Sequence, residues 1–520
     1  MKNKLGILFI FVFILSFGAA TNTFVHASNT KTQADVNLTF WWTEGTVEGA
    51  LYTQLIHEFE QQNPGITVTD TQKGYFDQPN EWNTAYTAGT APDVMRADVT
   101  WITNWANDGK IIAIDPHNIT DFTDFTHESI EKTMWNGQVY GIPQVVDALG
   151  MFYNKHFFSA AGVNVTADGF QSFQAFADAG QTLLSWAASS YDAGNQTASQ
   201  FSPFNMQGYT YAFLPIMFGF GADYFKDNNV TRANIDFNTT AWTNALTFLK
   251  SILPGGSQAM TPPVNEQGWS NIDSYFKTGR VAMDFMGPWA TSDYLANGPM
   301  FNATAYKAAF GASTAPSWVN ADNLGFMKVP KGVNQGIYSG GHAYVISKKS
   351  AHPVEALKLA NFLAGPEADY LRSKVNHLVS PRMSTYSSDF NTTDSYVPAN
   401  DPITNGFRLN LNTGITRPVH PYYFDIDGLV ATQLEAFRAG NTTVQETINN
   451  MVTKANAYFD VNPELIGGAG AYPDLSVSST TSATSSVSVS KSTASPGFEF
   501  FSVLALLSAL VVFKKRKEFF

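Results

Sequence analysis

The sequence predicts an α/β protein with more than one lobe, built on doubly wound sheets flanked by helices. The length favours several lobes, because 520 residues exceed what one ordinary core encloses. The composition favours a packed body, since 44% of the residues are hydrophobic and only 14% are charged. Strand and helix patterns also alternate regularly, which is typical of parallel sheets that bind ligands at the carboxyl ends of their strands.

This alternation is clearest at the start of the body. An apolar strand pattern covers 36–42, and Leu51, Leu55 and Phe59 then mark one stripe of a helix. The sequence Asn63-Pro64-Gly65 ends that helix. Further strand patterns occur at 66–69, 93–97, 281–285 and 343–347, and further helix patterns at 81–88, 170–186, 241–252, 353–363 and 444–459.

The N-terminus has the pattern of an export signal. Lys2 and Lys4 give a basic start, an apolar run covers 5–17, and Val25 and Ala27 occupy the cleavage positions. An uncleaved anchor is the alternative interpretation. We expect residues 1–27 to be a signal peptide and the body to be secreted.

The C-terminus carries a second membrane signal. Residues 476–497 form a Ser/Thr-rich stalk, and 498–520 contain an apolar run with a basic end, as the positive-inside rule requires. The run at 500–513 would cover roughly 21 Å of a bilayer core about 30 Å thick. This tail resembles the sorting tails of archaeal surface proteins, which are cut and exchanged for a lipid. We therefore expect an archaeal protein anchored on the outer face of the cell membrane.

Several classes of function are excluded or disfavoured by composition. The chain has no cysteine, so it has no disulfide, no thiol nucleophile and no lipidated cysteine. A net charge of −12 argues against nucleic acid as a partner. No nucleophile elbow, phosphate loop or zinc-protease motif occurs, so we expect no cofactor, metal or catalysis. Nine Asn-x-Thr sequons fit a glycosylated external protein, at Asn37, Asn118, Asn164, Asn195, Asn229, Asn238, Asn302, Asn391 and Asn441.

Seven segments of the body match, in order, those of one family of transport proteins. They are 38–45, 57–68, 89–98, 140–158, 276–290, 339–368 and 380–386. Through them the chain resembles the extracellular solute-binding proteins of sugar ABC transporters, a group that includes maltodextrin- and trehalose-binding proteins. The resemblance spans nearly the whole body and leaves out both ends.

The resemblance implies a two-lobed, periplasmic-binding-protein-like fold with three hinge crossovers. It places one lobe at about 28–145 plus 325–350 and the other at about 146–324 plus 351–470. A ligand would bind between the lobes and favour their closure, and the permease subunits would recognise the closed form. A monomer is expected.

A sugar site needs aromatic platforms and fixed hydrogen-bonding groups. By the resemblance, Glu44 and one of Trp41 and Trp42 face the ligand; the other tryptophan packs in the core, because neighbouring strand residues point oppositely. Asp98 and Trp101 follow the third strand. Asp98 either binds sugar or caps the next helix.

The middle of the chain supplies four more candidates. Asp147 matches an acid that contacts sugar, with a hinge hydrogen bond as the alternative. Gly287 would let the backbone approach a ligand on which Trp289 stacks, whereas the alternative is that Trp289 packs the following helix. Trp269 is a weaker platform candidate.

The last candidates depart from the family or remain open. Gly341 and His342 stand where many relatives have a glycine followed by a tryptophan, so a hydrogen bond replaces a stacking face. Arg382 matches a late arginine of the binding cleft, with a surface ion pair as the alternative. Arg417 is expected to be structural.

The predicted function is the binding component of an ABC importer for a mono- or oligosaccharide. One alternative is an extracellular glycoside hydrolase. Such enzymes place two carboxyl groups on either side of the glycosidic bond that they cleave, and Glu44, Asp98 and Asp147 could supply them. Others are the same fold carrying a peptide or polyamine, and a structural surface protein.

Overall fold

The computed structural model describes residues 35–43, 45–191, 197–335, 337–391, 394–411, 414–465 and 467–473. The predicted signal peptide, Glu44, the predicted stalk and the predicted membrane segment lie outside these residues. The described residues from 36 to 473 belong to one compact unit. None of the helices described is both long and apolar enough to cross a bilayer.

The first sheet has six strands in the described chain. These are β1 (Val36–Trp42), β2 (Ile66–Gln72), β3 (Val94–Asp98), β6 (Ile142–Ala148), β11 (Tyr338–Ile346) and β12 (Ile415–Thr416). The order is β12-β11-β3-β1-β2, and β6 also pairs with β11. Strand β1 runs parallel to β2 and β3, whereas β11 runs antiparallel to β3 and β6. The long strand β11 therefore joins the parallel part of the sheet to β6.

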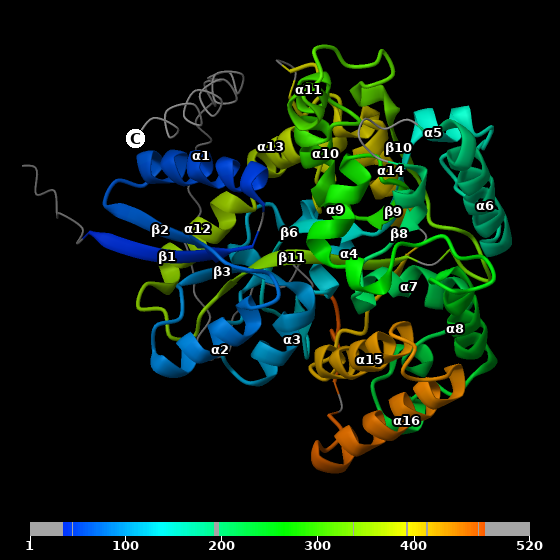
Figure 1. Cartoon of the computed structure of the whole chain (residues 1–520). Helices are drawn as coiled ribbons and strands as arrows, with labels where there is room; N and C mark the ends of the chain where they lie inside the picture. The colour runs from blue at the N-terminus through cyan, green and yellow to red at the C-terminus, as the bar shows by residue number, and fades with distance from the viewer. Residues whose placement is uncertain are drawn as a thin grey trace, which may run out of the picture. The chain divides into compact units, whose positions relative to one another are not determined.

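Helices cover both faces of this sheet (Figure 1). One layer contains α1 (Thr46–Gln62), α12 (Pro353–Leu363) and α13 (Pro366–Asn376); the other contains α2 (Gln78–Ala88) and α3 (Val99–Asn107). Leu38 and Leu359 share the first core, and Met95 and Trp105 share the second. Beside them lie α4 (His127–Glu131) and the hairpin of β4 (Met134–Trp135) and β5 (Gln138–Val139). We call this assembly the first lobe.

The second lobe is built on the sheet β10-β7-β9-β8. Its strands are β7 (Gly150–Asn154), β8 (Ser202–Asn205), β9 (Val281–Met286) and β10 (Leu324–Met327). Strand β7 is antiparallel to β9 and β10, while β8 and β9 are parallel, so this sheet is mixed.

The helices of the second lobe share one large core with its sheet. They are α5 (Lys155–Ala160), α6 (Phe173–Ser190), α7 (Thr210–Gly219), α8 (Thr240–Ile252), α9 (Trp269–Lys277), α10 (Thr291–Asn297), α11 (Ala303–Phe310), α14 (Pro402–Leu411), α15 (Tyr423–Arg438) and α16 (Val444–Val461). In Figure 1, α16 lies beside α15 and α8, as their contacts require. The predicted two-lobed α/β architecture is confirmed.

Three segments lie in the other lobe from the one predicted, and one of them is β12, which pairs with β11 of the first sheet. The boundaries expected from the sequence assign 351–470 to the second lobe, but α12 and α13 bury Leu359 and Leu371 in the core of the first. Strand β10, expected in the first lobe, pairs with β7 in the second. The apolar face of α12 decides where this helix lies, because it can be buried only against the sheet it covers.

Gly341 has a backbone that only glycine adopts without strain. Its φ angle is +143°, and a Cβ there would lie 2.3 Å from the carbonyl oxygen of Val145 on β6. The β11–β6 pairing shifts register between His342 and Ala343. The glycine therefore permits the close approach of these two strands.

We predict that Gly341→Ala lowers the midpoint of thermal unfolding, by an amount that corresponds to roughly 2–3 kcal/mol of strain. Gly428→Ala is the matched control, because nothing lies within 4 Å of a Cβ built on this helical glycine. The control should unfold at the same or a higher temperature. Equal midpoints for Gly341→Ala and the parent would contradict the prediction.

Candidate functional site

Three charged side chains come together at the carboxyl end of β3. Asp98 is the last residue of β3, Asp147 lies on β6, and Arg417 lies just after β12. The Arg417 Nη2 atom is 3.7 Å from Asp98 Oδ1. A Cβ on Gly340 would lie 2.4 Å from Asp147 Oδ1 and 2.8 Å from Arg417 Nη2, so both side chains lie over this glycine. We call Asp98, Asp147 and Arg417 the charged cluster.

Asp98 belongs to the charged cluster and also caps a helix. Its Oδ1 accepts from the backbone nitrogen of Thr100 at 2.8 Å and from its hydroxyl at 2.7 Å, which is an N-cap. Its Oδ2 accepts from the Tyr75 hydroxyl at 2.8 Å. Burial alone would raise the pKa of Asp98, but the charge of Arg417 and the bonds from Thr100 outweigh it, so the pKa lies below its ordinary value. Asp98 is an ionised, buried acceptor.

Asp147 is held from the second lobe. The Tyr211 hydroxyl, at the start of α7, donates to Asp147 Oδ1 at 3.1 Å. Burial raises the pKa of Asp147 to about 6, helped by the charge of Asp98 and opposed by Arg417 and Lys132. The two carboxyls thus share a site but titrate in different ranges.

His342 lies between the two carboxyls on the central strand. It is opposite Asp98 in the β11–β3 register, and its Nδ1 is 3.8 Å from Asp147 Oδ2, too far for a hydrogen bond. Neither ring nitrogen has a hydrogen-bond partner within the described part of the chain. Burial holds the pKa of His342 well below its ordinary value, so the ring is neutral. It offers one donor and one acceptor.

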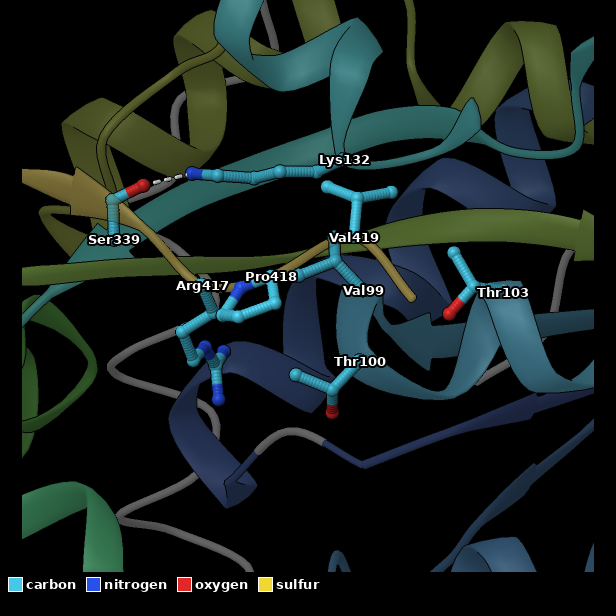
Figure 2. A pocket seen from close by; sticks show the side chains of 8 residues that line it. All are labelled: Val99, Thr100, Thr103, Lys132, Ser339, Arg417, Pro418 and Val419. Atoms are coloured by element: carbon cyan, nitrogen blue, oxygen red, sulfur yellow. Dashed lines mark hydrogen bonds between the residues drawn. The ribbon is translucent and has the colours of Figure 1, made fainter. Parts of the chain in front are cut away.

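A small pocket opens beside the charged cluster (Figure 2). Lys132 reaches across it to Ser339, and its ammonium also lies 2.8 Å from Glu128 and 3.1 Å from the carbonyl oxygen of Gly340. The lining residues are Val99, Thr100, Thr103, Lys132, Ser339, Arg417, Pro418 and Val419. The lysine is fully paired and fixes the backbone of β11 beneath the cluster.

Aromatic rings flank the charged cluster on both sides. Tyr75 packs against Trp101 with ring centroids 5.3 Å apart, and Tyr211 lies 6.4 Å from Trp289. The Nε1 atoms of Trp101 and Trp289 are buried without a partner among the described residues. Gly287 lets the Trp289 ring lie against the backbone, since a Cβ there would be 2.0 Å from the ring. Of the five predicted tryptophans, the structure brings Trp101 and Trp289 to the rings that bond the charged cluster.

The Trp41–Trp42 pair divides as strand geometry requires. Trp42 is 7% exposed, packs against the Tyr52 ring and donates from Nε1 to Asp70 at 2.8 Å. Trp41 is half-buried on the opposite face of β1, with the Lys73 ammonium 4.1 Å from its ring centroid. Trp42 therefore belongs to the core, and a ligand role remains a prediction for Trp41 alone.

Arg382 is not brought to the site. Its side chain is completely buried in the first lobe, where Nε donates to Ala364 O at 2.7 Å and Nη2 to Thr120 O at 3.0 Å. Its guanidinium also lies over the Phe125 ring. Both sequence interpretations of Arg382, a cleft contact and a surface ion pair, disagree with this burial. A buried guanidinium needs acceptors on all sides, and these backbone carbonyls supply them together with the Asp124 carboxylate, 3.5 Å from Nη1.

Two other predicted residues give no geometry for a site. Trp269 is the first residue of α9, but its side chain is not among those described, and Glu44 lies outside the described residues. Within the described chain no group of three potential ligands could hold a metal ion.

Four residues of the site were not identified from the sequence. Arg417 was expected to be structural, and Tyr75, Tyr211 and Lys132 were not singled out. Arg417 is 319 positions from Asp98 along the chain, so no local spacing joins the two. The sequence gives only weak signals for two of these residues: Tyr211 stands at the start of a helix, and Arg417 precedes Pro418.

Comparison with known proteins settles the family. Residues 43–370 match the family model described as bacterial extracellular solute-binding protein. This chain belongs to that family. The maltodextrin-binding protein MdxE of Bacillus subtilis is 24% identical to this solute-binding protein over 60% of this chain and 66% of its own length. The chain thus spans just under two thirds of that relative.

Solved structures with the same fold bind different solutes. The GacH receptor of Streptomyces glaucescens, solved unliganded and with acarbose, has a TM-score of 0.69 at 23% identity and covers 82% of this chain and 98% of its own. UgpB from Mycobacterium tuberculosis, solved with glycerophosphocholine, has a TM-score of 0.66 at 18% identity, covering 82% and 98%. At these low identities the structural similarity shows only that this solute-binding protein shares their fold.

We predict that Asp147→Asn changes how the stability of this solute-binding protein depends on pH. Because the folded pKa of about 6 exceeds the ordinary 3.8, the folded state keeps a proton that the unfolded chain releases. Parent stability therefore falls as pH rises from about 4 to about 6, whereas the amide has no such proton.

The midpoint of Asp147→Asn relative to the parent should rise across this window and then level off. The limit is roughly 3 kcal/mol, the free energy that corresponds to raising a pKa from 3.8 to about 6. The exposed Asp178→Asn on α6 is the control, with a flat difference expected. Calorimetric scans showing a flat or falling difference for Asp147→Asn would contradict the assignment.

Proposed function

We propose that this protein binds a mono- or oligosaccharide between its lobes and delivers it to an ABC permease. One observation carries the proposal. Buried donors without partners in the described chain, on Trp101, Trp289, His342 and Arg417 Nε, lie around the two buried carboxyls of the charged cluster. Unpaired buried donors cost free energy, so a site that keeps them together fits a ligand that completes them.

The chemistry of the site suits a sugar. Carboxylates accept hydrogen bonds from hydroxyl pairs, and a guanidinium or indole N–H donates to hydroxyl and ring oxygens. Rings at Trp289 and Tyr211 offer faces for the apolar C–H side of a sugar. The named relatives support this cargo, since MdxE is a maltodextrin-binding protein and GacH was solved with acarbose. A maltooligosaccharide is therefore the first ligand to test.

Replacing the proposed platform should remove binding. We predict that Trp289→Ala weakens maltooligosaccharide binding by at least about two- to tenfold, because stacking contributes roughly 0.5–1.5 kcal/mol beyond the buried area. Trp318→Ala is the control: this partly buried tryptophan of the second lobe stacks on His156 at 4.3 Å, away from the charged cluster. Titration calorimetry measures both. Equal affinity in the two variants would contradict the role of Trp289.

A non-sugar cargo is the second candidate. The UgpB structure supports it, because that protein of the same fold was solved with glycerophosphocholine. Competition titrations with sugars, peptides and polyamines decide between them. Catalysis is the other alternative, and the relatives are named as binding proteins rather than hydrolases. Turnover of a chromogenic glycoside by the protein would overturn the receptor proposal.

We also propose that residues 498–520 hold the protein on the outer face of the cell membrane, in an archaeal cell. The support is the apolar run with its basic end and the stalk before it. Deleting 498–520 should release the protein from the membrane fraction. Deleting only 478–495 of the stalk is the matched control and should leave it bound. Release by both deletions, or by neither, contradicts the proposal.

A further inference from the structure

The described chain passes between the lobes more often than the three crossovers predicted. It does so between β6 and β7, between β10 and β11, between α13 and α14, and on both sides of β12, which pairs with β11 of the first sheet. After α16 ends at Val461, residues 463–473 run from the second lobe to the first; residue 466 is outside the described part. We call the described residues 463–465 and 467–473 the strap.

The start of the strap is fixed to the second lobe. The Tyr422 hydroxyl donates to Pro463 O at 2.9 Å, and the backbone nitrogen of Arg232 donates to Glu464 Oε1 at 2.9 Å. His420 Nε2 lies 3.2 Å from Leu465 O, while its Nδ1 accepts from the Tyr422 nitrogen. His420 stands three residues after Arg417, so the strap is bonded to the segment that carries the arginine into the site.

The end of the strap is fixed to the first lobe. The backbone nitrogens of Asn136 and Gly137, in the turn of the β4–β5 hairpin, donate to Gly468 O at 2.8 Å and to Ala469 O at 2.9 Å. The Tyr472 ring stacks on His127 with centroids 4.3 Å apart. Ala469 and Tyr472 also pack against the core of the first lobe. The end of the strap is therefore held by backbone hydrogen bonds, ring stacking and apolar packing together.

Two glycines make the docking possible. A Cβ on Gly467 would lie 2.5 Å from the Trp135 ring, and one on Gly470 would lie 2.3 Å from the backbone nitrogen of Gly137. Gly470 also has a φ angle of +81°. Between them, Gly468 has nothing within 4 Å of a built Cβ. The strap can therefore pack this closely against the hairpin only because residues 467 and 470 have no side chains.

The lobes are in contact in this arrangement. Phe76 of the first lobe lies 5.3 Å, ring to ring, from Tyr209 of the second, and Asn104 Nδ2 donates to Pro421 O at 3.4 Å. Trp135 of the hairpin packs edge-on against His420 at 5.6 Å. Pro421 and His420 of these contacts adjoin Tyr422, which is bonded to the start of the strap, and Trp135 belongs to the hairpin that binds its end.

We infer that the strap tethers the second lobe to the first and favours the closed arrangement of the two lobes. The inference rests on the proposed function in one respect, because closure affects affinity only where a solute binds between the lobes. A tether bonded at both ends lowers the free energy of the closed state alone, and so shifts the equilibrium toward it before any solute binds.

The test measures lobe separation in the full chain without sugar. The chain has no cysteine, so Thr87→Cys on α2 and Ala308→Cys on α11, both exposed, provide a unique pair of spin-label sites. In this background Gly470→Ala should raise the population with the longer distance about tenfold, and Gly468→Ala should leave it unchanged. Sugar affinity, where measurable, should fall by a similar factor in Gly470→Ala.

A second variant guards against misfolding. Tyr472→Ala removes the stack on His127 without straining the backbone and should shift the distances in the same direction. Unchanged distances in both Gly470→Ala and Tyr472→Ala would overturn the tether, as would equal shifts in Gly468→Ala. Since the distances are measured without ligand, the strap is tested even in a protein that binds no sugar.

Discussion

The ion pair between Asp98 and Arg417, with Asp147 beside it, is the interaction on which the rest of the site depends. Burying a guanidinium and two carboxyls is costly unless each is paired and hydrogen-bonded. The chain meets part of this demand: Thr100 and Tyr75 bond to Asp98, and Tyr211 bonds to Asp147, while Arg417 Nε has no partner among the described residues. The partners come from both lobes, so the cluster is complete only when the lobes meet.

The fold explains why these groups can meet at all. Strand β11 runs antiparallel between β3 and β6, which sets His342 opposite Asp98 and Gly340 opposite Asp147. The glycines at 340 and 341 keep this strand free of side chains where the carboxyl and the guanidinium lie over it. Lys132 then fixes the strand from below through Ser339. The two glycines of β11 thus leave room for the side chains of Asp147 and Arg417 in the region between the lobes.

Much of this followed from the sequence, and the failures have physical causes. Alternation along β1 separated Trp41 from Trp42, and the end of β3 indicated Asp98, because strand periodicity and strand ends are local features. Asp147 was indicated by the family resemblance alone. Arg417 was missed because its partners are distant in the chain. Arg382 was misjudged because its acceptors, the backbone carbonyls of Ala364 and Thr120 and the carboxylate of Asp124, are brought together only by the fold. The predicted lobe boundary before α12 was wrong because the apolar face of a helix does not indicate which of two sheets it packs against.

The central claim is that a sugar takes up the donors and acceptors gathered around the charged cluster. A crystal structure of the protein grown with a maltooligosaccharide tests it most directly. The account predicts a sugar ring against Trp289, with its hydroxyls hydrogen-bonded to Asp98, Asp147 or Arg417. A sugar bound elsewhere, with these side chains still bonded as they are here, would contradict it.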